Sequence, residues 1–432
     1  MAISRRQFIK ALSAAGLGAG ASSLVVGPAL AGKGGGNVVV VGGGFGGATA
    51  AKYIRLIDPS VNVTLVEPVK SYTTCPGSNW VLGGLRDMNS ITFTYDTLAD
   101  KYGVKVMHDT VTGIDPEAKK LTLQGGDSLS YDRLVVSPGI DFRFDKVEGY
   151  DASVAEKIPH AWKAGPQTAL LADQLKAMKD GGLVLIAAPS NPFRCPPGPY
   201  ERASMIAHYL KSNKPKSKIM ILDTKDKFSK QGLFTKGWEE LYGYGTDKSM
   251  IEWVSASEGG AWNRVDAKNM SVHSDFVDQK ADVINVIPPQ FAGDIARGSG
   301  LADDTGWCPI DGKTFESTIH PGIHVIGDAS IAAPLPKSGY AANSEAKVCA
   351  FAVVAMLKGQ EAPTPTWVNT CYSLVGPRYG ISVAMVYDLT EEGKIGKVEG
   401  SGGVTPMDGN RRKEANYAES WYDNITDDVF LS

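Results

Sequence analysis

Residues 38–47 read VVVVGGGFGG, and this stretch decides the fold. Four consecutive valines predict a strand buried on both faces, as in a parallel sheet. The glycines that follow match G-x-G-x-x-G at the start of a helix expected over residues 48–56. Gly42 permits a tight turn, Gly44 lets a pyrophosphate approach the backbone, and Gly47 allows the helix to pack closely on the strand. The stretch therefore predicts a dinucleotide site at a helix N-terminus.

The segments around this motif support the same interpretation. A second strand, 61–66, ends in Glu67, about 20 residues after the last glycine, where an acid can bind ribose hydroxyls. The alternative is a glycine turn that matches the motif by chance. The strand, the helix and the acid stand at the spacings that the motif requires, which disfavours this alternative. Residues 131–139 (YDRLVVSPG) predict a strand that closes the first unit, and they resemble a segment of flavoproteins with two dinucleotide domains. Residues 322–329 (GIHVIGDA) predict a further buried strand, and a helix is expected from about 343 to 357.

A second α/β unit lies between these parts. Buried strands are expected at 183–187 and 218–223, but the turn after the first reads APSNPFRCPPGP over 188–199. It lacks the glycine fingerprint, and its prolines have no N–H with which to bind a pyrophosphate. We therefore expect no NAD(P)H site here, and a turn rebuilt around Cys195.

The predicted fold class is α/β. It comprises two Rossmann-like dinucleotide-binding domains, arranged as in glutathione reductase, and a C-terminal α+β interface domain. The expected boundaries are 32–150 with 275–360 for a discontinuous FAD-binding domain, 151–274 for the second domain, and 361–432 for the interface domain. The last contains a strand at 381–387 and a polar tail.

The first 31 residues are interpreted as a transport signal. SRRQFIK at 4–10 resembles a twin-arginine motif, and ALA at 29–31 is a small-x-small cleavage site. This predicts export to the periplasm; a membrane anchor is the alternative, which a short and glycine-rich apolar stretch disfavours. Beyond this segment no apolar run reaches the roughly 18 residues of a spanning helix.

Composition excludes several other classes. A net charge of −3 argues against a nucleic-acid partner. Five cysteines are an odd number, so at least one is free or bonded to something other than cysteine. The chain has no C-x-x-C-H for attached haem and no metal-ligand spacing, and its six histidines are scattered.

Four segments carry a specific resemblance: FRCPPGPYERAS at 193–204, PKSGY at 336–340, NTCYS at 369–373 and SWY at 420–422. Together they resemble the flavoprotein subunit of flavocytochrome c sulfide dehydrogenase, and the likeness spans the whole chain. The resemblance implies bound FAD, with Asp328 holding the ribityl chain. It also implies a thioether from Cys75 to the flavin 8α-methyl, although the spacing in Tyr72-Thr73-Thr74-Cys75 and the Pro-Gly that follows depart from the family pattern. A small buried thiol is the alternative for Cys75.

The resemblance further implies a redox-active disulfide between Cys195 and Cys371; a purely structural disulfide is the alternative. Hydrosulfide would attack this disulfide and leave a persulfide. Glu201 would accept a proton, or would only be a carboxylate favoured at a helix start. Lys337 would lie near the flavin edge, or in a solvated loop. Trp421 would lie beside the sulfide pocket, or take part in simple packing. Cys308 and Cys349 are expected to be buried free thiols.

Electrons would leave through a separate cytochrome c subunit that carries the haem, in a heterodimer with this chain. The nearest alternative, a sulfide:quinone oxidoreductase, needs a hydrophobic C-terminus, whereas residues 408–430 are polar. A non-catalytic electron-transfer or chaperone-like flavoprotein is a second alternative. An NAD(P)H-dependent disulfide reductase ranks last, since the second glycine fingerprint and a C-x-x-x-x-C pair are missing.

Overall fold

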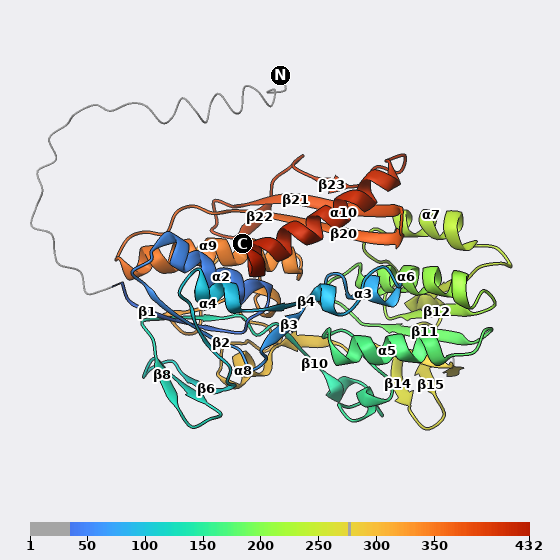
Figure 1. The fold of residues 1–432 in the computed structure, drawn as a ribbon, viewed down its shortest axis with the longest axis horizontal. Helices are drawn as coiled ribbons and strands as arrows, with labels where there is room; N and C mark the ends of the chain where they lie inside the picture. The colour runs from blue at the N-terminus through green and yellow to red at the C-terminus, as the bar shows by residue number, and fades with distance from the viewer. Residues whose placement is uncertain (1–34, 275–277) are drawn as a thin grey trace, which may run out of the picture. The chain divides into compact units, whose positions relative to one another are not determined.

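The computed structural model describes residues 35–274 and 278–432 (Figure 1). The expected transport signal at 1–31 lies outside these residues. The first sheet is parallel throughout, in the order β19-β9-β1-β2-β5. Its strands are β1 (Asn37–Val41), β2 (Asn62–Val66), β5 (Lys105–Met107), β9 (Arg133–Val136) and β19 (Ile323–Val325). The strands predicted in the first unit are thus confirmed, and strands distant in the sequence complete one sheet.

The valine run of β1 is buried on both faces of this sheet. Val38 and Val40 pack toward one side and Val39 and Val41 toward the other, all of them less than a tenth exposed. Helices α2 (Phe45–Ile57) and α9 (Gly339–Leu357) lie side by side on the first of these faces (Figure 1). Side chains alternate along a strand, so a run without polar interruption fits a sheet covered on both sides.

Helix α9 begins four residues before the expected start at 343. Ser338 is its N-cap, and the Ser338 hydroxyl oxygen accepts the N–H of Ala341. The first turn consists of small and polar residues, so apolar periodicity does not show where the helix begins. The serine at the N-cap position is the residue that indicates the start. The helix N-terminus therefore lies at Ser338, next to Lys337.

The second sheet is also parallel, in the order β13-β12-β11-β17. Its strands are β11 (Leu183–Ala188), β12 (Lys218–Asp223), β13 (Ile251–Val254) and β17 (Val283–Val286). The boundary expected at residue 275 is wrong, because β17 pairs with β11 and so belongs to the second unit. The antiparallel pair β10 (Ile140–Phe142) and β18 (Gln290–Ala292) marks the passage between the two units.

The third sheet is a hairpin of two long strands, β20 (Thr366–Gly376) and β21 (Tyr379–Leu389), extended by β22 (Ile395–Lys397) and β23 (Gly403–Val404). The polar tail expected after this sheet is instead a helix, α10 (Arg411–Thr426), which buries Ala415, Ala418 and Tyr422. Most of its exposed residues are charged or polar, which gave the segment a polar appearance. Strand β20 contacts α9, α10 and α6 (Gly198–Asn213), and so connects both Rossmann-like units.

Smaller elements complete the described chain. They are β3 (Ser71–Thr73), β4 (Thr92–Thr94), β6 (Val111–Asp115), β7 (Lys120–Leu123), β8 (Ser128–Ser130), β14 (Trp262–Asp266), β15 (Ser271–Ser274), β16 (Asp278–Lys280), α3 (Ser78–Leu82), α4 (Asp96–Asp100), α5 (Pro166–Ala177), α7 (Gln231–Tyr242), α8 (Asp294–Gly298) and a π-helical turn (Asp427–Leu431).

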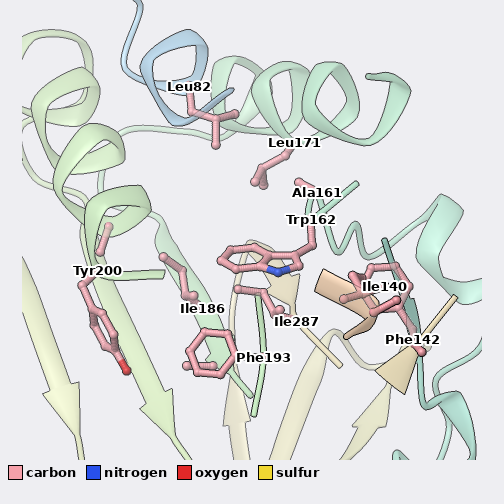
Figure 2. Close-up of a cluster of buried hydrophobic side chains, with 14 of the residues drawn as sticks. Leu82, Ile140, Phe142, Ala161, Trp162, Leu171, Ile186, Phe193, Tyr200 and Ile287 are labelled. Atoms are coloured by element: carbon pink, nitrogen blue, oxygen red, sulfur yellow. The ribbon is translucent and has the colours of Figure 1, made fainter. Parts of the chain in front are cut away.

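Trp162 lies in the main hydrophobic cluster, at the junction of several of these elements. Figure 2 shows its ring between Leu82 of α3 and Leu171 of α5 on one side and Ile186 of β11 on the other. Phe193, from the turn that precedes α6, completes the cluster near the indole. The loop that carries Trp162 is therefore held where the two Rossmann-like units meet.

Candidate functional site

The glycine turn after β1 has the backbone that the motif predicts. Gly42 has φ +95°, and a Cβ there would lie 2.3 Å from the Ser137 carbonyl oxygen. A Cβ on Gly47 would lie 1.8 Å from the Gly42 carbonyl oxygen, so neither position accepts a side chain. Glu67 Oε2 accepts the N–H of Gly43 at 2.6 Å, which places this acid beside the turn, as expected for a ribose ligand.

Asp328 offers a test of whether a flavin dinucleotide fits. This residue follows β19, and its Oδ1 is buried without a hydrogen-bond partner among the described residues. The guanidinium of Arg194 stands 3.9 Å from Oδ2. Burial raises the pKa of Asp328, while Arg194 and Lys337 oppose the rise. A buried acceptor without a donor fits a ribityl hydroxyl, so these residues suit the cofactor that the glycine turn predicts.

Lys337 is half-buried beside Asp328, and its contacts argue against the solvated-loop alternative. Its Nζ donates to the carbonyl oxygens of Asp328 and Ser330, each at 2.8 Å, and lies 3.8 Å from the centre of the Trp307 ring. Burial lowers the pKa of Lys337 to about 8, against the opposing fields of Asp328 and Glu345. The ammonium thus fixes the Asp328 turn and brings positive charge to it.

Cys75 lies in the turn before α3, close to the Trp162 loop. Its Sγ donates to the Trp162 carbonyl oxygen at 3.4 Å, and the guanidinium of Arg194 donates to the same oxygen. Burial raises the pKa of Tyr72 in the same region, with contributions from the charges of Cys75 and Asp328. The structure therefore brings Cys75 near the residues that fit the flavin.

Cys195 and Cys371 are held by the same loop, although they come from different units. The N–H of Cys195, at φ 57°, donates to the Lys337 carbonyl oxygen at 2.8 Å. The Ser338 hydroxyl donates to Asn369 Oδ1 at 2.7 Å, and Cys371 Sγ lies 3.5 Å from that oxygen. Lys337 and Ser338 thus position both cysteines at the start of α9.

Charges from several elements act on the Cys195 thiol. Burial raises the pKa of Cys195, and the fields of Glu201 and Cys371 raise it further. Both residues are half-buried thiols in the structure, so the disulfide between them stays a prediction. Cys308 and Cys349 are buried free thiols, as expected.

Glu201 connects three elements around these cysteines. Its Oε1 accepts the indole N–H of Trp80 at 3.1 Å and the main-chain N–H of Leu374 at 2.8 Å. Its Oε2 accepts from Asn79 Nδ2 at 3.0 Å. The carboxylate thereby joins α6 to α3 and to β20, the strand that carries Cys371.

Arg202 is a site residue that sequence reasoning missed. Only 2% of it is exposed, and the guanidinium donates to Asn79 Oδ1, Asn285 Oδ1 and the carbonyl oxygens of His160 and Ala161. It lies 4.9 Å from the Trp162 ring centre. Burial lowers its pKa to about 10. An arginine inside the otherwise apolar face of a predicted helix is the signal that could have revealed it.

An aromatic hollow opens on the opposite face of β20 from Cys371. Its volume is about 410 Å³, and Tyr340, Tyr372 and Trp421 line it. The Trp421 ring stacks on Tyr340 with 6.2 Å between centres. Because side chains alternate along a strand, Thr370 and Tyr372 face the hollow while Cys371 faces inward. Trp421 therefore belongs to this surface and not to the core.

Asp223 ends β12, at the position where an acid would bind the ribose of a second dinucleotide. Its carboxylate already accepts hydrogen bonds from neighbouring residues. Asp223 accepts from the Tyr200 hydroxyl at 2.5 Å, Lys225 Nζ at 2.6 Å and Trp253 Nε1 at 3.0 Å. The Tyr200 ring is also stacked on Phe228, with 3.7 Å between centres. These contacts agree with the expectation that no NAD(P)H binds here, which stays a prediction.

Two kinds of feature are absent from the residues that the structure describes. Within residues 35–274 and 278–432, no helix is both long and apolar enough to span a bilayer. Over the same ranges, no group of three or more metal-ligating side chains comes together.

The described architecture is that of a flavin-dependent disulfide oxidoreductase, and comparison with known proteins supports this class. Residues 36–167 match the pyridine nucleotide-disulphide oxidoreductase family. The solved structure of sulfide:quinone oxidoreductase from the hyperthermophilic bacterium Aquifex aeolicus has the same fold, with a TM-score of 0.71 at 17% identity over 91% of both chains. A NAD-dependent persulfide reductase from A. fulgidus gives a TM-score of 0.60 at 16% identity, over 91% of this chain and 77% of that one.

More specific matches cover two further segments of the chain. Residues 168–288 match the central domain of the sulfide dehydrogenase [flavocytochrome c] flavoprotein chain, and residues 363–430 match the flavin-binding domain of flavocytochrome c sulphide dehydrogenase. The flavoprotein chain of that enzyme from Chlorobaculum thiosulfatiphilum is 65% identical over 39 residues, 9% of this chain and 81% of that sequence. The mitochondrial sulfide:quinone oxidoreductase of Mus musculus is 22% identical over 336 residues, 74% of this chain and 70% of the mouse protein. The chain belongs to the family of flavocytochrome c sulfide dehydrogenase flavoprotein chains.

Proposed function

We propose that this chain is the flavoprotein subunit of a periplasmic sulfide dehydrogenase. It would oxidise hydrosulfide at Cys195 and Cys371, transfer the electrons to FAD and deliver them to a cytochrome c subunit. One observation carries the proposal: the Lys337–Ser338 segment holds both cysteines beside the residues that fit a flavin. Family membership supports the same chemistry.

The chemistry begins with the oxidised cysteine pair. Hydrosulfide attacks one sulfur, a new S–S bond forms, the Cys195–Cys371 bond breaks, and its electron pair stays on the departing thiolate. A second nucleophile, such as another hydrosulfide, removes the outer sulfur of the resulting persulfide and leaves two reduced cysteines. Re-forming their disulfide releases two electrons. In this proposal Glu201 accepts the substrate proton.

Bound FAD would accept this electron pair and release the electrons singly. Gly42, Gly44, Gly47 and Glu67 would hold its dinucleotide half, and Asp328 its ribityl chain. Lys337 would bring positive charge to the ring edge. A thioether at Cys75 would prevent loss of the cofactor outside the cytoplasm, and this covalent link is part of the proposal. Twin-arginine export, proposed from residues 4–10, suits a protein that folds around its cofactor first.

The proposed electron acceptor is a haem-bearing cytochrome c subunit in a heterodimer with this chain. The aromatic hollow of Tyr340, Tyr372 and Trp421 supports this, because it offers a surface on the far side of the strand that carries Cys371. The length of the match to sulfide:quinone oxidoreductases favours a second candidate, in which a quinone accepts the electrons. The polar outer face of α10, which carries both charged and uncharged side chains, favours the cytochrome.

The test is the flavin spectrum of the purified holoprotein on addition of sulfide. We expect bleaching in the wild type, and flavin retained but not reduced by sulfide in C195S and C371S. C349A, which changes a buried thiol within α9, should behave as the wild type. Normal turnover in C195S or C371S would remove the disulfide from the function. Recovery of flavin colour with oxidised cytochrome c, and not with a soluble ubiquinone analogue, would select the cytochrome; the reverse would select the quinone.

A further inference from the structure

Lys230 occupies the N-cap position of α7 and reaches toward the strand that carries Cys371. Its backbone is left-handed, with φ 60° and ψ 26°. The side chain is half-buried, and its Nζ donates to the Ser373 hydroxyl oxygen at 2.9 Å. Ser373 and Cys371 are two residues apart in β20, so they share one face at a spacing of roughly 7 Å. The ammonium therefore lies beside the sulfur site.

Local structure does not explain why a lysine stands at this position. N-caps favour small residues with a side-chain acceptor, and a cation is unfavourable at the positive end of a helix dipole. Non-glycine residues with positive φ are uncommon. Among the ion pairs of the described residues, none involves Lys230, so only charges beyond ion-pair distance offset its partial burial. Residues kept at such a cost concentrate at functional sites.

The charges that face Lys230 are those of the proposed sulfur chemistry. Burial lowers the pKa of its ammonium, and Cys371, Glu201, Cys195 and Glu414, in decreasing order, oppose that effect. In return, the field of Lys230 lowers the pKa of the Cys195 thiol against the larger effect of burial. Both sulfurs therefore lie in the field of the ammonium, whose hydrogen bond to Ser373 places it on the Cys371 face of β20.

We propose that Lys230 is the substrate-binding cation of the site, which attracts anionic hydrosulfide and stabilises the sulfur anion formed at Cys371. This inference rests on the proposed function and adds a residue to it. Hydrosulfide attacks Cys195 Sγ, the new S–S bond forms, and the Cys195–Cys371 bond breaks with its electron pair on Cys371. The ammonium then lies beside the resulting thiolate. Lys230 keeps its proton throughout, so no further acid or oxidant is needed.

A charge-selective alkylation experiment tests Lys230 without relying on turnover. The holoprotein is reduced, and the rates of Cys371 modification by anionic iodoacetate and neutral iodoacetamide are compared by mass spectrometry. Any change in the fraction of thiolate alters the rates with both reagents by the same factor. The ratio of the two rates therefore reports only how strongly the site attracts the incoming anion. We expect K230Q to lower this ratio on the order of tenfold, as a charge at this distance in a partly solvated site predicts. K230R should retain the ratio.

K227Q is the matched control, because Lys227 is exposed in the same segment before α7. It should leave the ratio unchanged. In parallel, the sulfide concentration needed for half-maximal flavin bleaching should rise about tenfold in K230Q, with a smaller change in the limiting rate. An unchanged ratio in K230Q, or an equal loss in K230R, would overturn the proposal. Failure of sulfide to bleach the wild type would instead refute the proposed function, and the alkylation ratio would still judge Lys230.

Discussion

Glu201 Oε1 accepts the main-chain N–H of Leu374 at 2.8 Å, three residues beyond Cys371. This bond joins the helix that follows Cys195 to the strand that contains Cys371. A carboxylate proposed as a proton acceptor therefore also fixes the separation of the two cysteine segments. The two roles are separable by experiment.

E201Q should destabilise the protein. A glutamine amide group at this position would meet the Asn79 Nδ2 donor, and Asn79 cannot turn its amide because its Oδ1 accepts from Arg202. Leaving a buried donor unpaired costs about 1–3 kcal/mol. Urea unfolding should show this loss, while E419Q on the exposed side of α10 should not. Full stability with lost sulfide oxidation would assign Glu201 to proton transfer alone.

His160 should make the protein sensitive to mild acid. Its Nδ1 accepts the N–H of Trp162 at 3.0 Å, and burial lowers its pKa from 6.5 to about 3. The folded state thus binds this proton less readily than the unfolded chain, so stability is fully present above pH 6.5 and is lost as the pH falls toward 3. The loss by pH 5 is about 2 kcal/mol.

H160Q should reduce that dependence, and H320Q provides the comparison. Unfolding free energies measured in urea at pH 7 and pH 5 give the difference for each variant. An equal acid loss in H160Q and the wild type would show that other groups govern the effect.

Phe430 should be a major contributor to stability. It is 1% exposed, and its ring stacks on Phe93 and Tyr72 with centres 5.2 and 5.6 Å away. Truncating a buried phenylalanine to alanine costs about 3–5 kcal/mol. Thermal unfolding should place F430A well below the wild type, and L431A, whose side chain is 56% exposed, close to it. Similar melting of both variants would contradict this packing.

Cys75 decides whether the flavin is covalently held. Acid precipitation of the wild type should leave flavin fluorescence in the pellet, whereas C75A should release it into the supernatant. C349A, a buried thiol in α9, is the control and should keep the flavin in the pellet. Free flavin from the wild type would rule out the thioether.

Local patterns predicted the parts of the fold that depend on neighbouring residues. The runs at 38–41 and 183–188 are apolar because both faces of each sheet are covered, and the glycines follow from a turn with positive φ. The start of α9 at Ser338 was missed because its first turn is not apolar.

Contacts between distant segments could not be predicted in this way. Arg202 depends on Asn79 and Asn285, and Lys230 depends on Ser373, so only the assembled fold reveals either role. The meeting of Cys195 and Cys371 was expected from family resemblance alone. Neither spacing nor composition indicates that these two cysteines should be joined.

The first sheet contains β9 and β19 as neighbours, yet nearly two hundred residues and an entire second sheet lie between them in the chain. Closing so long a loop is slow, so the intervening unit has time to fold first and to bring the ends of the outer sheet together. Substitutions that weaken the inserted unit should therefore lower flavin incorporation in freshly made protein, even where they touch no residue near the ring.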